Sequence, residues 1–143
     1  MRGLAVACAL LVLGVAFVAT TRDVERERYV AANEAVFEEL AVYPGSHVRS
    51  TRWTARREGE SSPVVGYPTL YFVTLPEGAR PEAVAAFFKR ELRPEWALVD
   101  EITEPPYAAG PILAFRRGEA AVGINLESWR GRLLEIHVDH RGA

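Results

Sequence analysis

An uncharged N-terminal segment constrains this chain more than any other feature of its sequence. Residues 3–20 form a run of 18 apolar or small residues. As a helix, this run would rise roughly 27 Å at about 1.5 Å per residue, close to the thickness of a thin bilayer core. A helix buried in a globular domain normally keeps a polar face, and this run has none. We therefore predict that residues 1–21 are a transmembrane anchor or an uncleaved signal, with residues 3–20 in the lipid bilayer.

Two fates are open for this segment, because cleaved signal peptides also combine a charged start with an apolar stretch. The small-x-small pair of Gly14 and Ala16 would leave Phe17 exposed at the new terminus, and a cut after Ala19 would place the bulky Phe17 in the wrong position. Cys8 lies within the apolar run rather than after it, which does not fit a lipoprotein. We expect a retained anchor, with cleavage as the alternative.

Two rules give opposite orientations for the segment in the membrane. Arg2 precedes the apolar run, whereas Arg22, Arg26 and Arg28 follow it, and the positive-inside rule would keep the rest of the chain in the cytoplasm. A very short charged tail is nevertheless typical of export signals, and long domains translocate largely regardless of flanking charge. We expect a single-pass membrane protein with its domain on the extracytoplasmic side.

The remaining residues, 22–143, are enough for a single domain with its own apolar core. The single cysteine, Cys8, lies outside this region, which excludes a disulfide, a cysteine metal cluster or a cysteine nucleophile from the domain. The formal net charge of the chain is −2, whereas nucleic-acid binding usually requires a strongly basic surface. We therefore expect no nucleic-acid partner.

The spacing of apolar residues predicts an α+β domain. Apolar residues at helical spacing favour helices over residues 23–41 and 81–92, with the first helix continuing from the anchor. Strands are expected where apolar residues alternate or form short runs. These strands cover residues 47–57, 69–75, 96–102, 112–116, 120–126 and 133–139. The fold expected after the N-terminal transmembrane helix is thus two helices packed on one mainly antiparallel sheet, in the order αββαββββ.

Several landmarks within residues 43–100 occur together in one family. They are Tyr43-Pro44-Gly45-Ser46, Leu75-Pro76-Glu77-Gly78-Ala79, Val84, Phe87-Phe88, Leu92 and Trp96. This set resembles the small domain of bacterial membrane-anchored proteins and lipoproteins of unknown function, which often read YPGA, then V..FY...L, then GW. Phe88 stands where those chains commonly have Tyr, and Glu95 where they have Gly. The resemblance implies an extracytoplasmic α+β module without known chemistry.

A basic stretch around Trp53 is the strongest candidate binding site. Arg49, Arg52, Arg56 and Arg57 surround this tryptophan, and such a combination suits an anionic polymer, lipid headgroups or an acidic protein surface. In a regular strand, only Arg49 and Arg57 share the face of Trp53. We predict binding by Trp53, Arg49 and Arg57, with a solvated strand edge as the alternative.

The C-terminal residues His137, Asp139 and His140 are the weak candidates for metal ligands. His137 and Asp139 would project from the same side of the last strand, but the sequence supplies no further ligand beside them. We therefore predict no metal site and no cofactor.

The domain lacks the usual signatures of catalysis. It contains neither a Gly-x-Ser-x-Gly elbow nor a glycine-rich phosphate loop. We expect a non-catalytic interaction or accessory role, with a protein of the cell envelope as partner. The alternative is a small ligand-binding or metal-assisted enzymatic domain that uses His137, Asp139 and His140.

Overall fold

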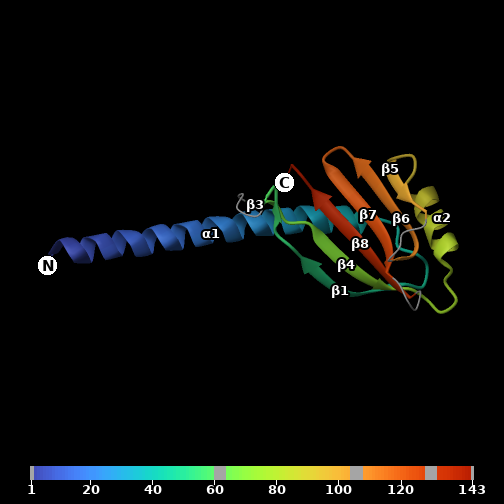
Figure 1. Cartoon of the computed structure of the whole chain (residues 1–143), viewed down its shortest axis with the longest axis horizontal. Coiled ribbons are helices and arrows are strands. Elements are labelled where there is room, and N and C mark those ends of the chain that lie inside the picture. The colour runs from blue at the N-terminus through green and yellow to red at the C-terminus, as the bar shows by residue number, and fades with distance from the viewer. Residues whose placement is uncertain (1, 60–63, 104–107, 128–131, 143) are drawn as a thin grey trace.

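The computed structural model describes residues 2–59, 64–103, 108–127 and 132–142, with the backbone alone for residues 2–20, 108, 109 and 127. Helix α1 (Arg2–Glu39) leads into a six-stranded sheet, and helix α2 (Pro81–Glu91) follows the second strand of that sheet (Figure 1). The sheet strands are β1 (His47–Trp53), β4 (Thr69–Thr74), β5 (Ala97–Ile102), β6 (Ala108–Arg117), β7 (Ala120–Glu127) and β8 (Leu133–His140). The α+β prediction with two helices and an antiparallel sheet is confirmed.

The strand order in the sheet is β1-β4-β8-β7-β6-β5, and every neighbouring pair is antiparallel. Strands β6, β7 and β8 pair in sequence order as a meander, and a tight turn at Gly118, with φ of 56°, connects β6 to β7. Strand β8 then pairs with β4, which lies earlier in the sequence. This pairing joins the two halves of the chain into one sheet.

The expected strand over residues 47–57 is wrong in its extent. Strand β1 ends at Trp53, and a separate two-stranded sheet is formed by β2 (Arg56–Arg57) and β3 (Val64–Gly66). The amide of Thr54 still donates to the carbonyl of Pro68 at 3.1 Å, but Pro68 has no N–H to return a bond. The pairing of β1 with β4 stops there for that reason.

The two faces of the sheet differ in burial. Val73, Phe115, Ile124 and Ile136 belong to a core cluster with residues of α1 and α2, and each of them is at most 1% exposed. Residues of the opposite parity, such as Phe72, are only partly buried. Both helices therefore cover one face of the sheet and leave the other open.

Helix α1 is continuous over 38 residues, which confirms that the helix expected at residues 23–41 continues from the N-terminal segment. Its N-terminal part extends well beyond the sheet (Figure 1). Among the residues whose side chains are described, from Thr21 onward, no helix is both long and apolar enough to cross a membrane. Residues 3–20 lie outside that set, and the transmembrane assignment stays a prediction.

A buried asparagine attaches α1 to the sheet. The Asn33 side-chain amide donates to the Tyr67 carbonyl at 2.7 Å and to the Thr69 hydroxyl at 3.1 Å. Its Oδ1 atom accepts the backbone N–H of His140 at 2.8 Å. Asn33 has no exposed surface, so each of these groups would lose its partner in a dry environment if the side chain were shortened.

We expect Asn33→Ala to lower the free energy of unfolding by roughly 2–4 kcal/mol, because buried polar groups are left without partners. The measurement is urea unfolding of the full-length chain in detergent micelles, followed by circular dichroism. Arg28→Ala, at an exposed position of the same helix, serves as control and should change the stability little. Equal stability of both variants would contradict a central role for Asn33.

Tyr71 shows the electrostatic character of the α1–β4 interface. Its ring stacks on Phe37 with the centroids 3.7 Å apart, and only 4% of the residue is exposed. Burial, followed by the negative charges of Glu34 and Glu38, raises the pKa of Tyr71 from 10.0 to about 12. Between pH 10 and about pH 12, the folded chain therefore retains a proton on Tyr71 that the unfolded chain loses.

Stability should consequently fall as the pH rises above 10, because the unfolded state binds fewer protons there than the folded state. Urea unfolding at pH 9 and pH 11 measures this loss. Tyr71→Phe should reduce the difference in unfolding free energy between pH 9 and pH 11. The stability that the substitution itself costs is measured at pH 9 and subtracted from both values. An unchanged difference would show that other groups cause the alkaline loss.

Candidate functional site

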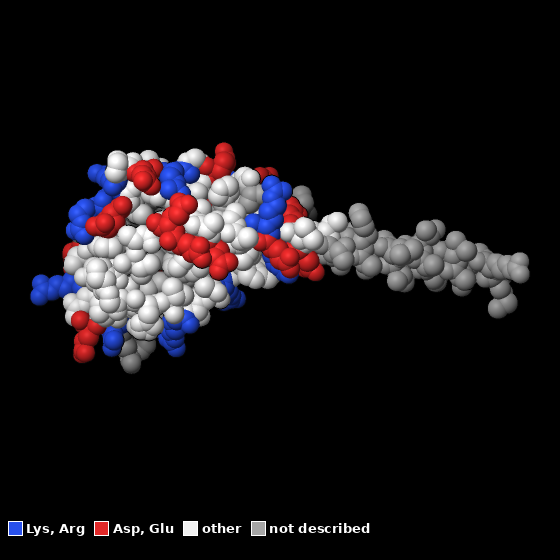
Figure 2. All heavy atoms as spheres, turned by 180° about the vertical axis from the view of Figure 1, so that it is seen from behind, with Lys and Arg blue, Asp and Glu red and all other residues white. Residues whose placement is uncertain are grey.

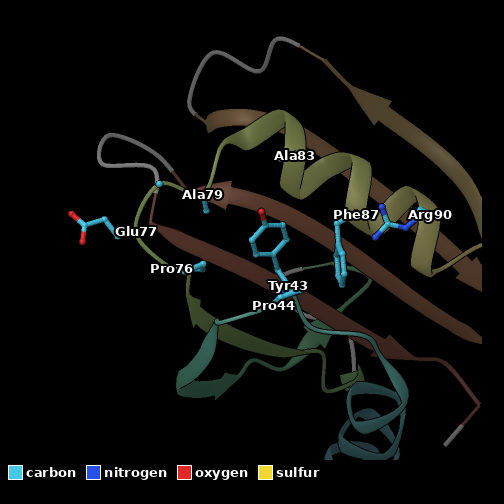
Figure 3. Close-up of a pocket in the computed structure, with 9 residues that line it drawn as sticks. Tyr43, Pro44, Pro76, Glu77, Ala79, Ala83, Phe87 and Arg90 are labelled. Carbon is cyan, nitrogen blue, oxygen red and sulfur yellow. The ribbon is translucent and has the colours of Figure 1, made fainter.

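A pocket of about 420 Å³ lies along one side of α2 (Figure 3). Two stretches that are distant in sequence, residues 43–44 and 76–90, contribute to it. The lining residues are Tyr43, Pro44, Pro76, Glu77, Gly78, Ala79, Ala83, Phe87 and Arg90. Most of these belong to the landmarks that resemble the bacterial membrane-anchored domains, so the fold brings those landmarks together at one place.

Two tight turns shape the pocket. Gly45 and Gly78 have φ of 77° and 82°, a region that residues with a Cβ atom rarely adopt. The amide of Ser46 donates to the Tyr43 carbonyl at 3.0 Å, which closes the first turn after α1. A Cβ atom on Gly45 would make ordinary contact with the Cβ of Pro76 at 3.4 Å, so the positive φ and not a lack of space favours glycine there.

One wall of the pocket is aromatic. The rings of Tyr43 and Phe87 meet edge to face with their centroids 5.4 Å apart, beneath α2 (Figure 3). The guanidinium of Arg90 lies 5.6 Å from the centroid of Phe87 and also pairs with Glu91 at 2.7 Å. In Figure 3 the carboxylate of Glu77 points away from the pocket. The lining thus mixes apolar rings with polar surface, and the guanidinium at its edge is already paired within α2.

The lining is made mainly of apolar, aromatic and small residues. A readable active site combines a nucleophile, a base that reaches it and a group that stabilises developing charge. None of the nine lining residues is a serine, threonine, cysteine or histidine. The aromatic rings and prolines suit an apolar side chain, whereas the Arg90 guanidinium already pairs with Glu91.

The predicted binding residues lie in different local settings. Trp53 ends β1 and is 44% exposed, with the Arg26 guanidinium 5.0 Å from its ring and the Tyr67 ring 5.8 Å away. Arg49 is exposed and lies where the β1–β4 register shifts, and Arg57 belongs to β2 in the second sheet. The regular strand that would align the three residues is therefore absent. Binding by Trp53, Arg49 and Arg57 stays a prediction.

Arg57 lines a second pocket, of about 340 Å³. The other lining residues are Arg56, Glu58, Val65 and Arg141. Arg56 donates to the carboxylate of Asp139 and to the Val65 carbonyl at 3.2 Å, and Arg141 lies 3.8 Å from the same carboxylate. Much of the positive charge in this pocket is therefore already paired within the domain.

The candidate metal ligands at the C-terminus lie on β8 as expected, but two of them have other side-chain partners. The register places His137 opposite Gly123 and Asp139 opposite Ala121, which confirms that these two residues share one side of the strand. However, the Nε2 atom of His137 lies 3.4 Å from Glu135, and the Asp139 carboxylate accepts from Arg56. Within the described ranges, no three His, Cys, Asp or Glu residues are grouped as metal ligands.

Charges of both signs are mixed over the surface. On the face drawn in Figure 2, acidic and basic side chains lie next to one another, and no large area carries a single sign. Two further ion pairs link separate elements, between Arg117 of β6 and Glu39 and between Lys89 of α2 and Glu101 of β5. Such a face offers an anionic polymer no continuous basic track.

Comparison with known proteins gives no assignment for this arrangement, because no protein family, curated protein sequence or solved structure matches the chain. The resemblance to small bacterial membrane-anchored domains therefore stays a prediction. It rests on the landmark residues, several of which line the pocket.

Proposed function

We propose that this chain is a non-catalytic binding module held at a membrane by residues 3–20. Its domain lies on the extracytoplasmic side, and the pocket next to α2 receives a segment of another envelope protein. The supporting observation is the continuity of α1, which begins at Arg2 and whose last turns pack into the domain core through Val36, with Leu40 of the core directly after the helix. The proposed bilayer segment and the domain are thus joined by helix and not by a flexible linker.

The position of the pocket fits this role. From residue 20 to Glu39 the helix rises roughly 29 Å, and Tyr43 and Pro44 of the pocket follow directly. Helix α2, beside which the pocket lies, is at the opposite end of the molecule from the N-terminus (Figure 1). The module would therefore present its pocket well clear of the membrane surface, where a partner can reach it.

The partner is characterised by the chemistry of the lining. Pro44, Pro76 and Phe87 suit an apolar side chain, and a carboxylate next to it would bind Arg90 in exchange for the Glu91 carboxylate. The alternative of a metal-assisted enzyme built on His137, Asp139 and His140 has less support, because a metal would have to displace Arg56 from the Asp139 carboxylate.

Anchoring predicts that the full-length chain stays with membranes after alkaline washing. Leu11→Arg combined with Leu13→Arg should release it, because each arginine costs about 2.5–3.5 kcal/mol at the centre of a membrane helix. Isoleucine at the same two positions is the matched control and should leave the chain membrane-bound. Release of the unchanged chain would contradict the anchor.

The same material tests the orientation. A reporter that is active only outside the cytoplasm, fused after Ala143, should be active. Activity of a cytoplasmic reporter at this position would overturn the proposed localisation while leaving the anchor in place.

Binding at the pocket predicts a difference between two exposed alanines of α2. Ala83 lines the pocket and Ala86 does not. Ala83→Arg should reduce the partner recovered with the chain after crosslinking and detergent extraction by about tenfold or more, because it fills the centre of the contact. Ala86→Arg should leave recovery unchanged. Recovery of the chain alone, or equal recovery with both variants, would contradict the proposal.

A further inference from the structure

An exposed tryptophan, packed against the buried Tyr67, lies on the side of the domain from which α1 emerges. Trp53 is 44% exposed, whereas Trp96 in the core is 4% exposed. The Trp53 ring meets Tyr67 edge to face at 5.8 Å, and Tyr67 in turn lies 6.0 Å from the ring of Tyr29 in α1. The arrow of β1, which ends at Trp53, points to the side of the sheet where α1 leaves it (Figure 1).

The contact with Arg26 shows how far along the axis of α1 the Trp53 side chain lies. The Arg26 guanidinium lies 5.0 Å from the Trp53 ring centroid and 3.0 Å from the Asp23 carboxylate, so the side chain reaches back toward the N-terminus of the helix. Residues 23–26 lie about 5–9 Å beyond residue 20. Trp53 is therefore at a similar distance from the end of the apolar run.

This height matches the polar layer of a bilayer. Headgroups occupy roughly 5–8 Å on each side of the hydrocarbon core. Tryptophan and tyrosine are enriched at this level, because their rings are apolar and their N–H or O–H groups find polar partners there. An exposed tryptophan that would be unfavourable in water is well placed in such a layer.

The charges around Trp53 agree with phospholipid as the neighbour. Arg22 is exposed and lies one helical turn before Arg26, on the same side of α1. At about 100° per residue, Glu25 and Glu27 project to either flank of that side. The surface next to Trp53 thus presents Arg22, and Arg26 with its partner Asp23, at the level of lipid phosphates, with which arginine forms strong charge-assisted hydrogen bonds.

We propose that Trp53, together with Arg22 and Arg26, forms a contact with the phospholipid headgroups of the bilayer that residues 3–20 span. This inference rests on the proposed anchoring and adds to it. The contact holds the β1 side of the domain against the membrane and so determines which side of the domain faces outward.

Fluorescence of the full-length chain in phospholipid vesicles tests this contact. The signal of Trp53 is obtained as the difference between the unchanged chain and Trp53→Phe, since Trp96 and Trp129 are present in both. Lipids brominated near the headgroup should quench this signal at least about threefold more than lipids brominated near the chain ends, as expected for an interfacial tryptophan. Iodide in the aqueous phase should quench it weakly.

A second comparison tests the arginines. In vesicles that contain phosphatidylglycerol, Arg22→Gln combined with Arg26→Gln should reduce the quenching of Trp53 by the shallow label. Arg93→Gln combined with Arg116→Gln, at exposed positions outside α1 and β1, is the control of equal charge change and should leave it unchanged. Equal quenching with both double variants would overturn the role of Arg22 and Arg26.

The outcomes separate this inference from the proposed function. If the chain resists alkaline extraction while iodide quenches Trp53 strongly and brominated lipids do not, the headgroup contact is wrong and the anchor stands. If the chain does not remain with the vesicles, both the anchor and the contact are wrong.

Discussion

The three hydrogen bonds of Asn33 determine how the structure is assembled. An apolar helix face can slide along a sheet at little cost, whereas a buried amide has its partners in one position only. Asn33 links α1 to the residues just before β4 and to the last residue of β8, which belong to opposite halves of the chain. The attachment of α1 through Asn33 determines the level along α1 at which Trp53 lies. It also determines how far the pocket lies from the N-terminal part of the helix.

Most of the fold could be predicted from the sequence because its periodicities are clear. Val122, Ile124 and Leu126 alternate with small or polar residues, and they are buried as a strand with one covered face requires. The end of β1 was missed because it depends on Pro68, which lies next to Thr54 only after the strands pair. A stretch rich in arginine and aromatic residues carries no local signal for such a stop.

The candidate sites were predictable in part. Trp53 was identified because an aromatic residue among arginines is visible in one segment, yet its nearest cation is Arg26 of α1, and this contact requires the tertiary structure. The pocket was not predicted, although Tyr43, Pro76 and Phe87 were recognised as landmarks. Their convergence depends on two glycine turns and on the packing of α2, which no single segment of sequence determines.

The unbroken helix α1 would make the position of the pocket depend on the membrane itself. Transmembrane helices tilt by about 20° on average, and a longer apolar segment tilts more in a thinner bilayer. Over the roughly 29 Å between residue 20 and Glu39, such a tilt displaces the far end sideways by about 10 Å. For a chain anchored as proposed, bilayer thickness would therefore help to set where the pocket meets its partner.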